Sequence, residues 1–282
     1  MTSLVSVSEH SDRLYILLSK LPSVEQRSKQ GIKTQEWIPA ADWLHIASGI
    51  DKVTLNINKF DETVLYCRTA WEYESKRNEL LTQSVTKLSI FNFIWGGLET
   101  IIKVISPNQL DIELARKLRR RNGIVDRAIF FLKQKYDPLP CVPMYDELIS
   151  QFRLVLAKHP SYSYLNKFFR EDELTSLSGL GLHIIRQIRN DFAHGSAKMP
   201  IPEYWGEKGN TITASEQLHL DVIEMSSRIL LLTVQMLLLA FYKSQHFSVD
   251  ILKDDNGIPV DENLEVVLKV LHLADYKIEQ NR

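Results

Sequence analysis

Apolar residues recur at helical spacing along most of the chain. The clearest stretch runs from residue 61 to residue 105, which contains no proline and ends at Ser106-Pro107. Its apolar residues follow one another mainly at i+3 and i+4, which predicts one very long helix or two helices in series. Alternation with a period of two, which is typical of a half-buried strand, is scarce. We therefore expect an all-α protein in the form of a helical bundle.

Further helices are predicted after this stretch. They cover approximately residues 111 to 121, 124 to 136, 144 to 158, 174 to 194 and 213 to 244. Asn122-Gly123 suits a left-handed end for the first of these helices, and Gly179 and Gly181 are expected to interrupt the fourth. Thr213 and Glu216 have the spacing of a capping box, which marks the start of the fifth.

The two ends of the chain depart from this pattern. In residues 1 to 55, Pro22, Gly31, Pro39 and Gly49 separate short apolar segments, so we expect a small irregular or mixed N-terminal lobe. Residues 56 to 245 form the expected helical domain. Residues 246 to 282 form a C-terminal extension, in which the segment from 264 to 273 is amphipathic and predicts a terminal helix.

Composition narrows the class of partner. Lys and Arg total 34 against 35 for Asp and Glu, so any nucleic-acid site must be a local patch. The two cysteines lie far apart and suggest neither a disulfide framework nor a thiolate zinc site. The first ten residues lack the pattern of a secretory signal, and the apolar run at 229 to 242 is shorter than the ~20 residues that cross a bilayer. These features predict a cytoplasmic protein without membrane contact.

Most familiar catalytic motifs are absent from the chain. The sequence contains no GxxxxGK[ST], HExxH, GxSxG, GxGxxG or PCxxC pattern. Its eight histidines show no pairing at metal-ligand spacing beside carboxylates. We therefore expect neither a metal site nor a cofactor.

The segment IRQIRNDFAHG, residues 185 to 195, carries the most distinctive chemistry. Asn190 and His194 are four residues apart and share a helical face, and the same polar stripe is expected to include His183, Arg186 and Gln187. Gly195 is expected to end the helix directly after His194, where an imidazole exchanges protons near neutral pH. The opposite face is apolar and is predicted to be buried: Ile184, Ile185, Ile188 and Phe192.

Residues 189 to 194, RNDFAH, resemble the R-x4-H motif of the HEPN superfamily, including the polar residue that usually follows the arginine. The similarity covers the motif and its bundle context, roughly residues 60 to 245. It implies a helical bundle that dimerises with two motifs face to face, and a metal-independent endoribonuclease of the toxin or phage-defence type. It also implies catalytic roles for Arg189 and His194, with Asn190 orienting the site or the scissile phosphate. Ser196 stands where one subgroup carries a nucleotidylated tyrosine, so that regulation is not expected.

This chemistry needs no metal. RNA supplies its own nucleophile, the 2′-hydroxyl, so the site needs a group that moves protons and a cation on the phosphate. In this interpretation His194 moves the proton and Arg189 holds the phosphate oxygens as their negative charge grows. Two copies of the motif would supply both a base and an acid.

Three secondary candidates for substrate binding lie outside the motif. The run RKLRRR at 116 to 121, with Arg116, Arg119 and Arg120, has the charge to contact an RNA backbone, although such a run is also typical of a solvated helix end. Glu99 is expected on a helix that approaches the motif, or else as a boundary carboxylate or ion-pair partner. Arg186 is a candidate because it shares the polar stripe.

Two functions remain open from the sequence. The leading hypothesis is a homodimeric endoribonuclease that acts on RNA and is restrained by an antitoxin or a sensor subunit. The alternative is a non-catalytic HEPN-like helical module that binds RNA, a nucleotide or a protein partner. Two copies of Arg189 and His194 converging across a two-fold axis would favour the nuclease, whereas motifs that point apart would favour the module.

Overall fold

The structure, a computed structural model, describes the following parts of the chain: residues 3–27, 36–60, 66–105, 123–137, 140–171, 175–204, 212–243, 245, 247–254 and 256–278. The described chain is mainly helical, with a small three-stranded sheet near its C-terminal end. The expectation of a helical bundle is therefore confirmed at the level of secondary structure. The predicted helix at 111 to 121 lies outside the described residues.

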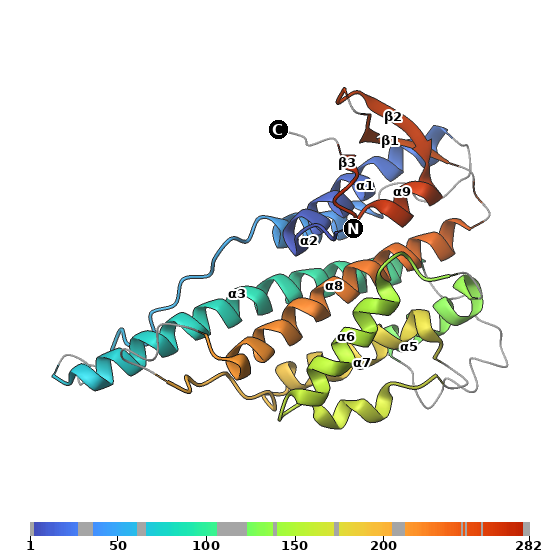
Figure 1. Ribbon diagram of the computed structural model, residues 1–282. Helices are drawn as coiled ribbons and strands as arrows, with labels where there is room; N and C mark the ends of the chain where they lie inside the picture. The colour runs from blue at the N-terminus through green and yellow to red at the C-terminus, as the bar shows by residue number, and fades with distance from the viewer. Residues whose placement is uncertain are drawn as a thin grey trace.

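Two long helices, α3 (Arg68–Ile105) and α8 (Ala214–Tyr242), lie side by side through the centre of the molecule (Figure 1). The prediction of a long helix up to residue 105 is confirmed, and α3 is one continuous helix. The capping box is also confirmed, because the Glu216 amide donates to Thr213 Oγ1 at 3.2 Å and the Thr213 amide donates to Glu216 Oε2 at 2.8 Å.

Both central helices are long and apolar enough to cross a membrane when judged by length and composition alone. The apolar run at 229 to 242 is thus part of a longer helix than the run itself indicated. In α8, 83% of the most apolar window is buried inside the protein. The apolar character of α8 is therefore accounted for by its place in the core.

The remaining helices cover this pair from both sides (Figure 1). On one side lie α1 (Val7–Arg27) and α2 (Ile38–Ser48), and on the other lie α5 (Ile124–Phe131), α6 (Tyr145–Lys158) and α7 (Leu177–Ala193). A π-helical turn, Leu132–Tyr136, continues α5, and a 3-10 helix, Ser163–Phe168, follows α6. Their buried side chains belong to one hydrophobic cluster with those of α3 and α8.

The N-terminal region differs from its prediction. Residues 1 to 55 were expected to be irregular or mixed, but the described part forms the helices α1 and α2, which pack on each other. Pro39 lies in the first turn of α2, where its missing amide proton costs nothing. Pro22 lies inside α1, so here a proline did not end the helix.

The C-terminal extension contains the expected helix and an unexpected sheet. Helix α9 (Leu264–Val270) is shorter than predicted, and β1 (Ser248–Lys253) pairs antiparallel with both β2 (Pro259–Asn263) and β3 (Lys277–Ile278). The expectation of a chain without strands is therefore wrong for the C-terminal extension. Because β2 is almost entirely exposed, it shows no alternation that the sequence could reveal.

A buried polar network ties the two ends of the chain to α8. The fully buried Gln235 accepts from His10 Nε2 at 2.8 Å through its Oε1 and donates to His272 Nδ1 at 3.1 Å through its Nε2. His272 Nε2 in turn donates to the Pro143 carbonyl at 2.9 Å. The network thus joins α1, α8 and the segment after α9 inside the core.

Candidate functional site

Helix α7 carries the R-x4-H motif and is uninterrupted from Leu177 to Ala193. The predicted break near Gly179 and Gly181 is wrong, because both glycines serve close packing. A Cβ at Gly181 would lie 2.4 Å from a methyl of Ile229 and 2.7 Å from the Tyr145 hydroxyl. The absence of a side chain therefore lets α7 approach α6 and α8, which fixes the helix that presents the motif.

The end of α7 is closed by a Schellman motif at Gly195. The Ser196 amide donates to the Asp191 carbonyl at 2.8 Å, and the Gly195 amide donates to the Phe192 carbonyl at 3.2 Å. Gly195 has φ of +68°, a left-handed conformation that other residues adopt only with strain. His194 is the C-cap residue of α7. The predicted helix end at Gly195 is confirmed, and it places His194 at a geometrically defined terminus.

The side chains of the motif differ in exposure. His194 is exposed, whereas Arg189 and Asn190 are half-buried. Neither His194 nor Asn190 makes a side-chain hydrogen bond with another described residue, so both present free polar groups. Because α7 rises ~1.5 Å per residue, Arg189 and His194 are separated by ~7.5 Å along the helix axis.

The polar stripe predicted on α7 is shorter than expected. His183 was expected on the exposed stripe, but its side chain is buried and its ring meets that of Phe168 edge-on, with 5.5 Å between centroids. The apolar face is confirmed for Ile184, Ile185 and Ile188, which are all fully buried. The exposed polar surface is therefore confined to the last turns of the helix.

Arg189 is held by an aromatic ring from the central helix α3. Its guanidinium carbon lies 5.7 Å from the centroid of the Trp95 ring, and Trp95 is 5% exposed. The Trp95 indole nitrogen donates to Glu99 Oε1 at 2.8 Å. Stacking attracts the cation to the face of the ring while leaving the N–H groups at its edge available. Among the described residues, Arg189 has no carboxylate partner.

Glu99 therefore lies close to the motif, as the sequence suggested, but it acts on Trp95 rather than on Arg189. The four-residue spacing of Trp95 and Glu99 on α3 is the signal that could have revealed this pair. Trp95 is buried in the core. Its contact with Arg189 was missed.

A second contact fixes the end of α7 from the side of the 3-10 helix. The Tyr164 hydroxyl donates to Asp191 Oδ2 at 2.7 Å. Burial and this hydrogen bond raise the pKa of Tyr164 above its usual value, so the hydroxyl remains a donor at neutral pH. Nothing in the sequence pairs these two residues, which are far apart along the chain.

The remaining predicted substrate-binding residues separate into two groups. Arg186 forms an ion pair with Asp126 of α5, and both side chains are largely buried. This pairing assigns Arg186 to packing between α5 and α7 and leaves its charge compensated. Arg116, Arg119 and Arg120 lie outside the described residues. Within the described part of the chain, no group of three or more His, Cys, Asp or Glu residues could hold a metal ion.

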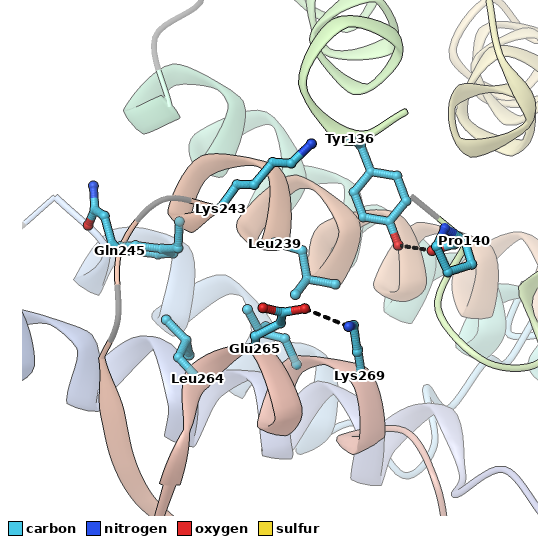
Figure 2. A pocket seen from close by; sticks show the side chains of 10 residues that line it. Tyr136, Pro140, Leu239, Lys243, Gln245, Leu264, Glu265 and Lys269 are labelled. Carbon is cyan, nitrogen blue, oxygen red and sulfur yellow. Dashed lines mark hydrogen bonds and ion pairs between the residues drawn. The ribbon is translucent and has the colours of Figure 1, made fainter. Parts of the chain in front are cut away.

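A cavity of about 220 Å³ lies at the C-terminal end of α8 (Figure 2). Leu239, Leu264 and Leu268 contribute apolar walls, and Tyr136 contributes a ring from the π-helical turn. The rim is polar, with Lys243 and a 2.6 Å ion pair between Glu265 and Lys269. None of the predicted site residues that the structure describes lines this cavity.

Comparison of the chain with known proteins found no match, whether to a family model, to a curated protein or to a solved structure.

Proposed function

We propose that this protein is a metal-independent endoribonuclease whose catalytic residues are Arg189, Asn190 and His194. The observation that carries the proposal is the state of the motif at the end of α7. Arg189 is fixed over Trp95 without a carboxylate partner among the described residues, and the His194 side chain is exposed without a hydrogen bond to them. A cation and a proton-transfer group are thus held on one short, rigidly capped segment.

The chemistry follows from these two groups. His194 takes the proton of the RNA 2′-hydroxyl, whose oxygen attacks the adjacent phosphorus. The bond from phosphorus to the 5′-oxygen breaks, and the leaving oxygen receives a proton from the His194 of a second copy. Arg189 donates N–H groups to the phosphate oxygens as charge accumulates on them. The products are a 2′,3′-cyclic phosphate and a free 5′-hydroxyl.

Asn190 completes the site in this proposal. It lies on the same helical face as His194, and its carboxamide has no partner among the described residues. A carboxamide both donates and accepts, so Asn190 is suited to orient the His194 ring or the scissile phosphate. In this proposal the protein acts in the cytoplasm as a toxin or phage-defence effector. Because uncontrolled RNA cleavage is toxic to the cell, an antitoxin or a sensor subunit would restrain it.

A second candidate function is a non-catalytic helical module that binds RNA, a nucleotide or a protein partner. The cavity between α8 and α9 favours it, because an apolar cavity with a polar rim is typical of a small-ligand site (Figure 2). In this alternative, Arg189 contributes only packing on Trp95. The two functions differ in whether substitution of the motif changes cleavage or only stability.

The decisive experiment incubates the purified protein with tRNA, ribosomal RNA and messenger RNA in the presence of EDTA. Fragments that end in a 2′,3′-cyclic phosphate are expected from the native protein and absent with His194→Ala. His45→Ala is the matched control, since His45 is also exposed but lies on α2. Loss of all cleavage on chelation, restored by a divalent ion, would contradict the mechanism. Equal cleavage by His194→Ala would contradict the assignment of the site.

A further inference from the structure

A second cavity lies beside the motif. It measures about 170 Å³, is open to solvent, and is lined by the end of α6, the segment that follows α7 and the first turns of α8. Lys198, which lines it, is four residues after His194, so the two Cα atoms are at most ~14 Å apart. A short single-stranded segment of a substrate bound at His194 would therefore reach this cavity.

Two buried histidines form its inner wall. His159 and His219 are 7% and 5% exposed, and their ring centroids are 5.8 Å apart. The Ser161 amide donates to His159 Nδ1 at 3.1 Å, so the neutral ring carries its proton on Nε2. Burial lowers the pKa of both rings, that of His219 to about 4, so both are neutral at pH 7. His159 thus offers an N–H donor toward a ligand.

His219 Nε2 is the second independent sign of a ligand. This atom is buried and has no hydrogen-bond partner among the described residues. A buried nitrogen without a partner destabilises the folded state, and such atoms in native proteins call for a specific reason. Because this atom is also closed to water, a ligand in the cavity would become its partner only after a small movement of the His219 ring.

The rest of the lining combines polar edges with apolar surface. Glu203 and Lys198 are exposed at the rim and have no ion-pair partner among the described residues. Met199 and Ile201, which are 47% and 66% exposed, add apolar surface to the same lining. A nucleobase has the matching character, because its faces are apolar and its edge carries both donors and acceptors.

We propose that this cavity binds a single nucleobase of the RNA substrate, close to the scissile phosphate. This inference rests on the proposed nuclease function and adds a specificity site to it. Two other ligands fit less well. A metal ion would need a lone pair on His159 Nε2, which carries the proton, and an inorganic anion would meet the carboxylates of Glu203 and Glu216. His159 and Glu203 are expected to contact the edge of the base.

The test uses the full-length His194→Ala protein, which binds without cleaving, with its histidines labelled for NMR. Each of the four ribonucleoside monophosphates, AMP, GMP, CMP and UMP, is titrated in turn. At least one is expected to shift the signals of His159 and His219 while leaving that of exposed His45 unchanged. Absence of a response to all four, or an equal shift at His45, would overturn the proposal. A response of the two histidines to zinc ions alone would also overturn it.

Two further variants test whether Glu203 contacts the bound nucleotide. Glu203→Gln, at an exposed position, should weaken nucleotide binding by about tenfold, because a charge-assisted hydrogen bond is lost. Glu147→Gln is the matched control, since Glu147 is exposed and lies ~18 Å along α6 from His159. Unchanged affinity in Glu203→Gln would contradict the assigned contact. Nucleotide binding without any RNA cleavage by the native protein would defeat the proposed function alone, and cleavage without nucleotide binding would defeat this inference alone.

Discussion

The guanidinium of Arg189 lies over the ring of Trp95, with 5.7 Å from its central carbon to the ring centroid. The same arrangement occurs elsewhere in the molecule, where the guanidinium of Arg153 lies 5.7 Å from the ring of Phe169. The two pairs can therefore be compared directly, because Arg189 belongs to the motif and Arg153 does not.

The first prediction uses this comparison. Arg189→Ala should reduce RNA cleavage at least ~100-fold, because the phosphate loses its cation in the transition state. The same substitution should lower the free energy of unfolding by less than ~1 kcal/mol, because a partly exposed cation–π contact contributes about that much at most. Arg153→Ala should produce a similar small destabilisation with unchanged cleavage. Rates from gel assays and unfolding in urea provide both measurements. A destabilisation of several kcal/mol in Arg189→Ala would instead assign the residue to the scaffold.

The second prediction concerns Gly195. Its φ of +68° is strained for any residue with a Cβ, although a Cβ built there meets nothing within 4 Å. Gly195→Ala should therefore lower the free energy of unfolding by ~1 kcal/mol through backbone strain alone. Cleavage should also fall, because the Schellman motif that positions His194 is weakened.

Gly257 provides the matched control for this change. It has φ of +80° and equally open surroundings, but it lies in the turn between β1 and β2. Gly257→Ala should show the same loss of stability with no change in cleavage. Equal losses of activity in the two variants would mean that strain acts globally rather than at His194.

The sequence predicted best those features that depend on neighbouring residues. The extents of α3 and α8 followed from long uninterrupted periodicity, and the ends at Thr213 and Gly195 followed from capping residues. The N-terminal helices were not predicted, because prolines were taken to interrupt the helical pattern. Pro39 sits where a helix tolerates it, and Pro22 is accommodated within α1.

The candidate site was predictable only in part, because some of its contacts join residues that are distant in sequence. The position of the motif at a helix end follows from local spacing. The contact between Arg189 and Trp95, and the hydrogen bond from Tyr164 to Asp191, depend on how distant segments pack. No periodicity encodes such contacts. The pairing of His159 with His219 is of the same kind, since their helices meet only in the folded chain.

The third prediction concerns pH and stability. The pKa of His272 is lowered to about 4, and that of His10 is lowered well below its usual value, chiefly because both rings are buried. An unfolded chain binds protons at these sites near pH 6.5, whereas the folded chain does not. Stability is therefore fully present above pH ~6.5 and is lost as the pH falls toward 4. Each ring contributes a slope of at most ~1.4 kcal/mol per pH unit.

The structural cause is specific. Protonation of His272 Nδ1 removes the acceptor for Gln235 Nε2, a bond of 3.1 Å in the core. Urea unfolding at pH 7.5, 6.0 and 5.0 measures the slope, and His272→Asn should reduce it because one titrating group is gone. An unchanged slope in His272→Asn would mean that other groups control the acid sensitivity.

The last prediction concerns assembly, because the proposed mechanism needs two copies of His194. The long helix α8, which begins after Thr213, is a poor source of the dimer surface. Its leucines are buried within one chain, as Leu230, Leu237 and Leu238 illustrate with at most 1% exposure. Apolar surface is exposed on α2 instead, where Ile38, Trp43 and Ile46 are 40%, 40% and 46% exposed.

Helix α2 packs on α3, the helix whose Trp95 contacts Arg189. Trp43 packs so tightly on α3 that a Cβ at Gly96 would lie 2.9 Å from its ring, and Gly96 is the neighbour of Trp95. An isologous contact through α2 would hold two copies of the chain together in one dimer. Ile46→Glu should weaken dimerisation at least tenfold by placing a charge in the apolar contact, and cleavage should become dependent on protein concentration.

Leu154→Glu is the matched control, because Leu154 is also an exposed apolar residue, at 62%, but lies on α6. This variant should remain dimeric and active in light scattering and cleavage assays. A dimer that survives Ile46→Glu and dissociates with Leu154→Glu would move the interface to α6. A native protein that is monomeric and cleaves RNA at a rate per subunit independent of concentration would show that one His194 suffices, and the two-copy mechanism would then be wrong.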